Sequence, residues 1–214
     1  MNKIAIYGAG GFGKEVACIL NLINEKNPTW EIVGFFDDGK EKGLQISHFG
    51  NVLGNLHDLN TWPEPLSIAF AVGSPAILQK LVIGITNTNI SYPNIIHPEA
   101  FIADKETLKI GHGNVIVRGC SFSCDVNIGN FNQFNSISAL AHDVIVGDFN
   151  VFMPLTRISG ETTIGNQNFF GIGSVVLQCI KIGNNTRIGA GSYIMRNTKD
   201  GFLYFGNPAR KTDI

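Results

Sequence analysis

From residue 110 onward, an apolar side chain recurs at every sixth position of the chain. The repeat holds without a slip from Ile110 to Ile194, and every member is Ile, Leu, Val or Phe. A glycine follows every third member, so three hexads make one larger unit: Gly111, Gly129, Gly147, Gly165 and Gly183. An amphipathic α-helix would need a period of 3.6 residues. The pattern therefore predicts a parallel β-helix of triangular cross-section, in which each hexad forms one short strand and one corner and three hexads form one coil.

The corners and the start of this repeat carry two further expectations. Corners need tight turns, often with positive φ, so we expect Gly and Asn to occupy them. Ile90, Ile96 and Ile102 also step by six, and the register then slips by two residues before Ile110. We therefore expect an entry coil with a small bulge across residues 104–109.

The first ninety residues follow a different pattern. Short apolar runs predict strands over residues 3–8, 31–36 and 66–72, and helical spacing of apolar residues predicts helices over 14–24 and 76–85. Strands that alternate with helices indicate a small parallel, Rossmann-like sheet. With three or four strands this sheet is too small to bind a dinucleotide, and a mononucleotide or a nucleotide-sugar fits better.

A glycine-rich loop, GAGGFG from Gly8 to Gly13, joins the first strand to the first helix. The helix N-terminus offers N–H groups and a partial positive charge to a phosphate. Acidic residues end the second strand, and a Gly-Ser pair follows the third. The candidate nucleotide contacts are Gly10, Gly11, Asp37, Asp38, Gly73 and Ser74. A tight turn without a ligand, and a solvated turn for the Asp pair, are the structural alternatives.

Composition narrows the function classes. Charged residues make up 15% and apolar residues 44% of the 214 residues, which allows a sizeable core and excludes disorder. The net charge of −1 gives no support for binding nucleic acid or a membrane surface. The start of the chain lacks a signal-peptide pattern, and the 4 Cys form no CxxC pair and have no His at zinc-finger spacing. We therefore expect a cytoplasmic protein with free thiols and no metal.

Six segments, in this order, carry a family resemblance: IYGAGGFGKEV, GFFDDG, AVGS, IIHPEA, AHDVIVGDF and GNPAR. Together they resemble the bacterial sugar O-/N-acyltransferases with hexapeptide repeats, which include sialic-acid O-acetyltransferases and nucleotide-linked 4-amino-sugar N-acetyltransferases. The resemblance spans nearly the whole chain and implies that the β-helix is left-handed. It also implies an acetyl-CoA donor and a homotrimer with active sites between the β-helices of neighbouring subunits. The flat faces of the predicted prism carry few charges, which suits their burial against two neighbouring subunits.

The predicted fold class is therefore α/β plus β, in three parts. Residues 1–92 form a Rossmann-like nucleotide-sugar-binding domain. Residues 93–198 form the left-handed β-helix of hexapeptide repeats, and residues 199–214 form a C-terminal cap.

The family's catalytic base falls on His142, next to Asp143. His142 comes two residues after the inward Leu140, in a corner that faces out of the prism. An imidazole can take the proton that an amine or hydroxyl loses as it attacks a thioester. A step of one coil places Gly160 beside His142, where a backbone N–H could stabilise the oxyanion. An ordinary corner glycine is the alternative.

Ile172 and Ala190 are one coil apart and fall on the family's CoA contact positions, with plain corner packing as the alternative. Arg210 either meets a phosphate or caps the fold. Three departures from the family leave the acceptor's identity open. Phe12 stands where many members have His, Val151 replaces a second His, and Leu78 lies near the place of an Arg.

We predict an enzyme that acetylates the amine of a nucleotide-linked amino sugar for surface-glycan biosynthesis, with His142 as general base in direct attack on the thioester. A sialic-acid-type sugar O-acetyltransferase is one alternative, and a non-catalytic trimeric scaffold with a nucleotide-sensing domain is another. A γ-type carbonic anhydrase is disfavoured because His112 and His142 are five hexads apart, which is not a whole number of coils. A reductase that uses the GAGGFG loop is also disfavoured, because it would need a second, catalytic α/β half. The sequence leaves the sugar, the nucleotide, the acyl chain length and the choice of amine or hydroxyl undetermined.

Overall fold

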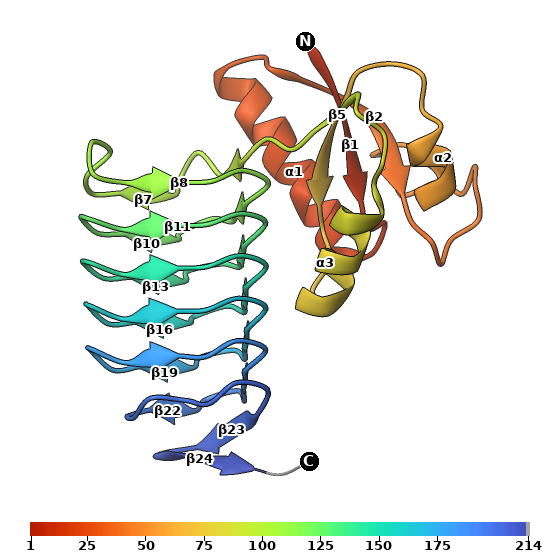
Figure 1. Ribbon diagram of the computed structural model, residues 1–214. Coiled ribbons are helices and arrows are strands. Elements are labelled where there is room, and N and C mark those ends of the chain that lie inside the picture. Colours follow the sequence, from red (N-terminus) through yellow and green to blue (C-terminus); the bar gives the residue numbers. More distant parts are fainter. Residues whose placement is uncertain (213–214) are drawn as a thin grey trace. The chain divides into compact units, whose positions relative to one another are not determined.

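A computed structural model describes residues 1–212 of the chain and divides it into two compact units, residues 1–98 and 99–214. The first unit is a five-stranded parallel sheet with helices, and the second is a stack of short strands (Figure 1). The boundary lies a few residues after the one predicted from the sequence. None of the helices in residues 1–212 is both long and apolar enough to cross a membrane.

The sheet of the first unit has the order β3-β2-β1-β4-β5, and all its neighbours pair in parallel. Its strands are β1 (Asn2–Tyr7), β2 (Trp30–Phe36), β3 (Val52–Gly54), β4 (Leu66–Phe70) and β5 (Ile90–Ser91). Its helices are α1 (Gly11–Lys26), α2 (Leu56–Asn60) and α3 (Pro75–Gly84). Strands β1 and β4 are buried on both faces over most of their length. Such strands need consecutive apolar residues, which explains why the apolar runs of the sequence lie at the centre of the sheet. The predicted Rossmann-like sheet is confirmed, and it gains two short edge strands.

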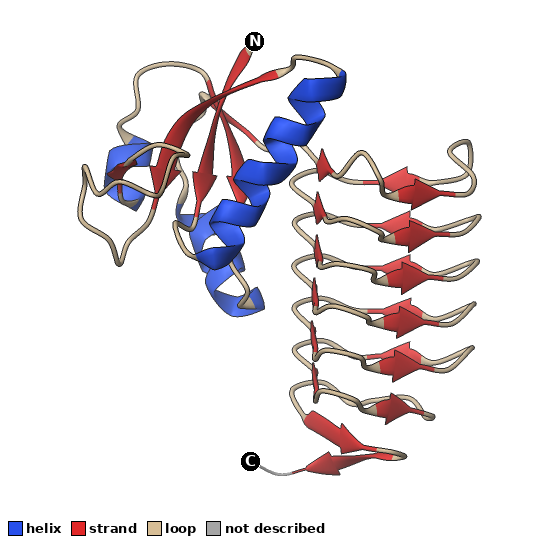
Figure 2. Cartoon of the chain, turned by 180° about the vertical axis from the view of Figure 1, so that it is seen from behind, coloured by secondary structure: helices blue, strands red, loops and turns tan. Residues whose placement is uncertain are grey.

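The second unit is a β-helix built from two-residue strands that stack in rungs (Figure 2). One face consists of β7 (Phe101–Ile102), β10 (Ser121–Phe122), β13 (Ala139–Leu140), β16 (Arg157–Ile158), β19 (Val175–Val176) and β22 (Tyr193–Ile194). The second face consists of β8 (Lys109–Ile110), β11 (Asn127–Ile128), β14 (Ile145–Val146), β17 (Thr163–Ile164) and β20 (Lys181–Ile182).

The third face contains β9 (Val115–Ile116), β12 (Gln133–Phe134), β15 (Val151–Phe152), β18 (Phe169–Phe170), β21 (Arg187–Ile188), β23 (Leu203–Gly206) and β24 (Ala209–Thr212). The last two strands form an antiparallel hairpin within the predicted cap. The strand β6 (Ile95–Ile96) precedes them all in the chain. The hexapeptide repeats identify this solenoid as a left-handed β-helix.

The inward ladder and the entry bulge are confirmed. Phe134 stacks on Phe152 with ring centroids 4.5 Å apart, and Phe152 stacks on Phe170 at 4.6 Å. These rings are fully buried inside the prism. At the entry, Phe101 pairs with Ser121. The sequence interval between these two residues is two residues longer than the three hexads that separate paired residues in later coils. The two extra residues are the predicted slip.

The expectation that Gly and Asn supply the positive φ of the corners is wrong for most corners. Positive φ recurs every six residues, but Leu155 adopts it with φ 65° and Phe131 with φ 55°, as do Ile, Glu, Gln and Cys elsewhere. The glycines that recur at every third hexad have another role. A Cβ on Gly129 would lie 2.7 Å from the Gly147 carbonyl oxygen, so the close approach of coils requires glycine there.

Asparagine builds hydrogen-bonded ladders between coils. The Oδ1 of Asn132 accepts from the backbone N–H of Asn150 at 2.9 Å, and the Oδ1 of Asn150 accepts from that of Asn168 at 2.9 Å. These side chains are fully buried, and each satisfies a backbone N–H of the next coil that would otherwise lack a partner. The ladders hold consecutive coils in register and so fix the spacing of the residues along each edge.

Candidate active site

His142 and Asp143 project together from the corner that follows β13. Asp143 has φ 57°, and this left-handed turn brings the two neighbouring side chains to the same side. His142 Nδ1 lies 2.9 Å from Asp143 Oδ2. With Nδ1 donating to the carboxylate, Nε2 is left to accept a proton. Both side chains are about half exposed, at 54% and 56%, so substrate can reach them.

The His142 imidazole lies over Gly160, which occupies the same place one coil further on. A Cβ on Gly160 would be 2.5 Å from Cε1 and 2.6 Å from Nε2 of the ring. Glycine is therefore required for the ring to take this position. The Gly160 carbonyl accepts from Cys179 N at 3.0 Å, whereas the Gly160 N–H forms no hydrogen bond within residues 1–212. An unpaired donor thus lies beside the imidazole.

The edge that carries His142 and Gly160 continues through Gln178 to Arg196, one residue per coil. Exposed apolar side chains precede the last two of these residues, namely Leu177 at 39% and Met195 at 44% exposure. The edge ends in a hollow of about 390 Å³ with three cationic side chains in its lining: Arg196, Arg210 and Lys211. Sequence reasoning missed Arg196, although three steps of one coil from His142 lead to it.

The predicted CoA contacts Ile172 and Ala190 stack on each other at another corner. Gly191 N donates to the Ile172 carbonyl at 2.8 Å, and Ile172 is 50% exposed. This corner is not the one that carries His142, because His142 and Ile172 are five hexads apart and a whole number of coils would need a multiple of three. A single β-helix therefore does not bring these two sets of residues together.

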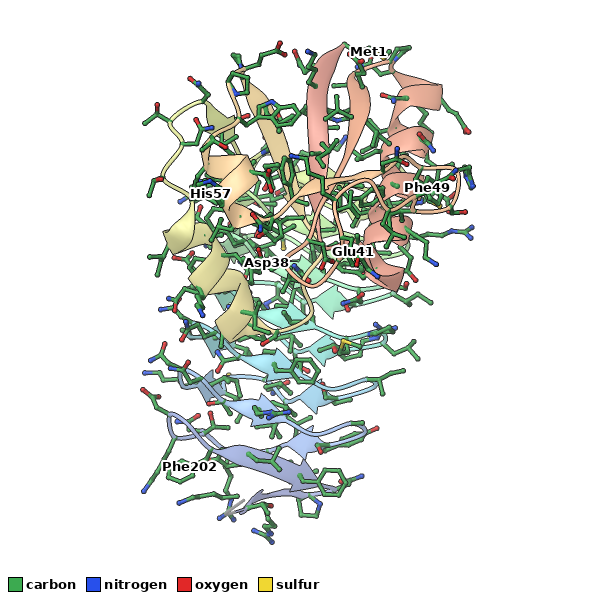
Figure 3. The ribbon with its side chains drawn as sticks, turned by 90° about the vertical axis from the view of Figure 1, so that its right-hand side faces the viewer. Met1, Asp38, Glu41, Phe49, His57 and Phe202 are labelled. Atoms are coloured by element: carbon green, nitrogen blue, oxygen red, sulfur yellow. The ribbon has the colours of Figure 1, made fainter. Side chains whose placement is uncertain are left out.

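The predicted nucleotide contacts lie together at one edge of the first unit's sheet. The glycine loop follows β1, Asp37 and Asp38 follow β2, and Gly73 with Ser74 follows β4. Figure 3 labels Asp38. In a parallel sheet these are all carboxyl ends, where ligands of α/β sheets bind. A Cβ on Gly8 would lie 2.5 Å from the Ala71 carbonyl oxygen, whereas Gly10 and Gly11 have nothing within 4 Å of a Cβ position. The loop is thus fixed by Gly8 and open at Gly10 and Gly11.

Both aspartates also hold the loops of the domain. Asp37 Oδ2 accepts from Ala9 N at 2.8 Å, and its Oδ1 accepts from Gly39 N at 2.9 Å. Asp38 Oδ1 accepts from Leu56 N at 2.9 Å. Each carboxylate oxygen has a second lone pair that remains available to a ligand. These residues are therefore oriented acceptors at a strand end, with Asp37 half-buried and Asp38 exposed.

A hollow of about 380 Å³ adjoins the glycine loop. Two lysines line it, Lys14 in the first turn of α1 and Lys40 in the loop after β2. Neither forms an ion pair with any residue from 1 to 212, whereas the nearby Lys42 binds Asp58 at 2.8 Å. A cation at a helix N-terminus opposes the helix dipole. That unfavourable placement is the sequence signal that could have identified Lys14.

Comparisons with known proteins match both units. Residues 3–85 match the family described as PglD N-terminal domain, and residues 161–196 match the one described as bacterial transferase hexapeptide (six repeats). The chain is a hexapeptide-repeat transferase with a PglD-type N-terminal domain. This agrees with the resemblance found in the sequence. A search of curated protein sequences gave no match.

Three solved structures resemble this transferase over its whole length. The acetyltransferase domain of PglB from Neisseria gonorrhoeae, in complex with acetyl coenzyme A, is 29% identical with a TM-score of 0.88, covering 99% of this chain and 100% of that one. PerB from Caulobacter crescentus, in complex with CoA and GDP-perosamine, is 26% identical with a TM-score of 0.87, covering 100% and 98%. WeeI from Acinetobacter baumannii is 26% identical with a TM-score of 0.87, covering 99% and 100%.

The three departures from the family occupy distinct places in this transferase. Phe12 lies in the first turn of α1 and is half-buried, whereas Val151 and Leu78 are fully buried. The side chains of Val151 and Leu78 are apolar, so neither offers a polar group to a ligand. Among the described residues, no group of three or more His, Cys, Asp or Glu is placed to hold a metal ion.

Proposed function

We propose that this transferase moves the acetyl group of acetyl-CoA to the amine of a nucleotide-linked amino sugar. One observation carries the proposal: an exposed imidazole, bonded to a carboxylate through Nδ1, lies beside the unpaired N–H of Gly160. A base and an adjacent N–H donor are what an acyl transfer from a thioester needs. The likeness to PerB, crystallised with CoA and GDP-perosamine, and to the PglB domain with acetyl coenzyme A supports this reaction class.

His142 and Gly160 divide the chemical work in this proposal. His142 Nε2 accepts the proton that the attacking amine loses, and Asp143 holds the ring and stabilises its positive charge. The N–H of Gly160 donates to the carbonyl oxygen as negative charge develops there. Acetyl-CoA supplies the activated acyl group, so no covalent intermediate on the protein is required. The CoA thiolate leaves, takes that proton from the His142 imidazolium and departs as the free thiol.

Along the His142 edge, the order of the side chains matches the order of the chemical groups in acetyl-CoA. From His142 the edge passes the apolar Leu177 and Met195 and ends at Arg196, Arg210 and Lys211. Three coils at the roughly 4.8 Å strand spacing separate His142 from Arg196 by about 14 Å. The pantetheine arm, at about 1.2 Å per bond, spans roughly 15 Å. We propose that its apolar part lies on Leu177 and Met195 and that the cationic hollow takes its phosphates.

Ile172 and Ala190 contact CoA from a second copy of the chain in this proposal. They lie on a different corner from His142, so a groove between two β-helices would bring both corners to one donor. This arrangement is the reason for proposing a homotrimer. The mass of the purified protein in solution tests it, because a stable monomer would leave the two corners apart.

The N-terminal unit is proposed to bind the nucleotide part of the acceptor. The N–H groups at Gly10 and Gly11 and the ammonium groups of Lys14 and Lys40 suit a diphosphate. Asp37 and Asp38 suit N–H or hydroxyl donors of a base or ribose, and Gly73 with Ser74 lies at the same edge of the sheet. A nucleotide-linked sugar of this type is a building block of surface polysaccharides, whose assembly would place the enzyme in the cytoplasm.

The test is a panel of UDP-, dTDP- and GDP-linked 4-amino sugars incubated with acetyl-CoA and the purified protein. Release of the CoA thiol gives the rate, and mass spectrometry identifies the acetylated product. Resistance of the product to hydroxylamine distinguishes an amide from an ester and so tests the choice of amine over hydroxyl. Turnover of at least one acceptor is expected. Binding of nucleotide sugars without any turnover would favour a sensor or scaffold.

A further inference from the structure

Tyr7 is a buried tyrosine whose hydroxyl bonds one of the proposed acceptor contacts. It is the last residue of β1, directly before the glycine loop, and only 2% of it is exposed. Its ring stacks against Phe36 at 6.4 Å and against Phe70 at 6.0 Å. The hydroxyl donates to Asp38 Oδ2 at 2.9 Å. A phenylalanine would supply the same ring packing, so packing alone does not explain the hydroxyl.

Asp38 is held from two sides by donors on different elements. The Tyr7 hydroxyl binds Oδ2 from the end of β1, and Leu56 N binds Oδ1 from the start of α2. Tyr7 is the only side chain among the hydrogen-bond donors to Asp37 and Asp38 in residues 1–212. Removing its hydroxyl would free Oδ2 and let the carboxylate rotate about the remaining bond.

We infer that Tyr7 is a positioning residue for the acceptor, whose hydroxyl fixes the orientation in which Asp38 receives the base or ribose of the nucleotide. This rests on the proposed function. Groups that orient a ligating side chain strongly affect affinity although they do not touch the ligand. Burial, and then the bond to Asp38, raises the pKa of Tyr7 well above its ordinary value of 10.0, so the hydroxyl remains a donor across the working pH range.

The test compares Tyr7→Phe with Tyr92→Phe. Tyr92 is a matched control because it is half-buried and its ring stacks on the same Phe70 at 5.8 Å, while it is not a donor to Asp38. Tyr7→Phe is expected to raise the acceptor KM about tenfold, as loss of an orienting partner does. The KM for acetyl-CoA should stay unchanged. Tyr92→Phe should leave both values at the wild-type level, and thermal unfolding checks that both variants fold.

A double-mutant cycle with Asp38→Ala separates positioning from a merely structural role. If Tyr7 acts through Asp38, Tyr7→Phe adds no further increase in KM once Asp38 is alanine. It should then even raise the unfolding temperature, because Asp38→Ala leaves the buried Tyr7 hydroxyl without its partner. An unchanged acceptor KM in Tyr7→Phe, or an equal increase in both backgrounds, would overturn the inference.

Calorimetric titration with UDP and GDP keeps the inference testable apart from turnover. Tyr7→Phe should weaken the binding of whichever nucleotide the wild type binds by about tenfold. If the wild type binds a nucleotide but acetylates no acceptor, the proposed function fails while the role of Tyr7 is still measured. If the wild type binds neither nucleotide and acetylates nothing, both proposals fail.

Discussion

The imidazole of His142 lies directly over Gly160, its counterpart one coil along the β-helix. The ring comes so close that a Cβ at position 160 would lie 2.5 Å from its Cε1 atom. The absence of a side chain on one residue therefore sets the position of the other. The same closeness places the unpaired Gly160 N–H beside the nitrogen proposed as the base.

Gly160→Ala should displace the His142 ring without unfolding the coil. A misplacement of about 1 Å at a reacting group can cost roughly a hundredfold in rate, and we expect kcat to fall tenfold to a hundredfold. Gly119→Ala is the control. Gly119 has φ 70° at a corner where Ile137 adopts φ 61° in the next coil, and a Cβ there meets its nearest atom at 3.4 Å. Steady-state kinetics that show equal kcat for both variants would contradict the account.

Asp143→Asn should reduce kcat about tenfold, because it removes the negative charge that holds Nδ1 and stabilises the protonated ring. The effect should be smaller than removal of the base, since the pair is half exposed. Asp125→Asn is the matched variant. Asp125 lies one coil earlier at the same corner with φ 56°, and it does not bond His142. If both variants lose the same activity, general surface charge and not the bond to His142 is responsible.

Arg196→Gln should raise the KM for acetyl-CoA about tenfold and leave the KM for acetyl-pantetheine unchanged, because the shorter donor lacks the diphosphate and the 3′-phosphate. Rates with both donors, measured on the same preparation, check this. Arg187→Gln, an exposed arginine of β21 outside the cationic hollow, should behave like the wild type with either donor. An Arg196 variant that loses affinity equally for both donors would place the phosphates elsewhere.

The repeat was the part of the fold most fully predictable from the sequence. Its inward positions follow from burial alone, so the spacing of Phe134, Phe152 and Phe170 is enough to assign them to one ladder. The role of asparagine could not be predicted in this way. Asn132 and Asn150 bond from one coil to the next, and such bonds exist only once the coils are stacked. Corner conformation was mispredicted because stacking imposes positive φ even on Phe131 and Leu155.

The proposed site could be derived from the sequence where the chemistry of a residue and the register of the repeat coincide. His142 and its neighbour Gly160 follow from the step of one coil, and the same step would have led to Arg196. The bond from Tyr7 to Asp38 was not predictable, because it joins two residues distant in sequence that meet only through the pairing of β1 with β2. The edge strands β3 and β5 are three and two residues long, too short for any periodicity to reveal them.

The central claim is that His142 accepts the acceptor's proton during acetyl transfer from CoA. Its most direct test is the rate of CoA release by His142→Ala, with acetyl-CoA and an accepted amino-sugar nucleotide at saturation. The account predicts that kcat falls at least a hundredfold, as expected for loss of a general base, while the mass of the assembly and the binding of both substrates persist. A variant that turns over at the wild-type rate would contradict it.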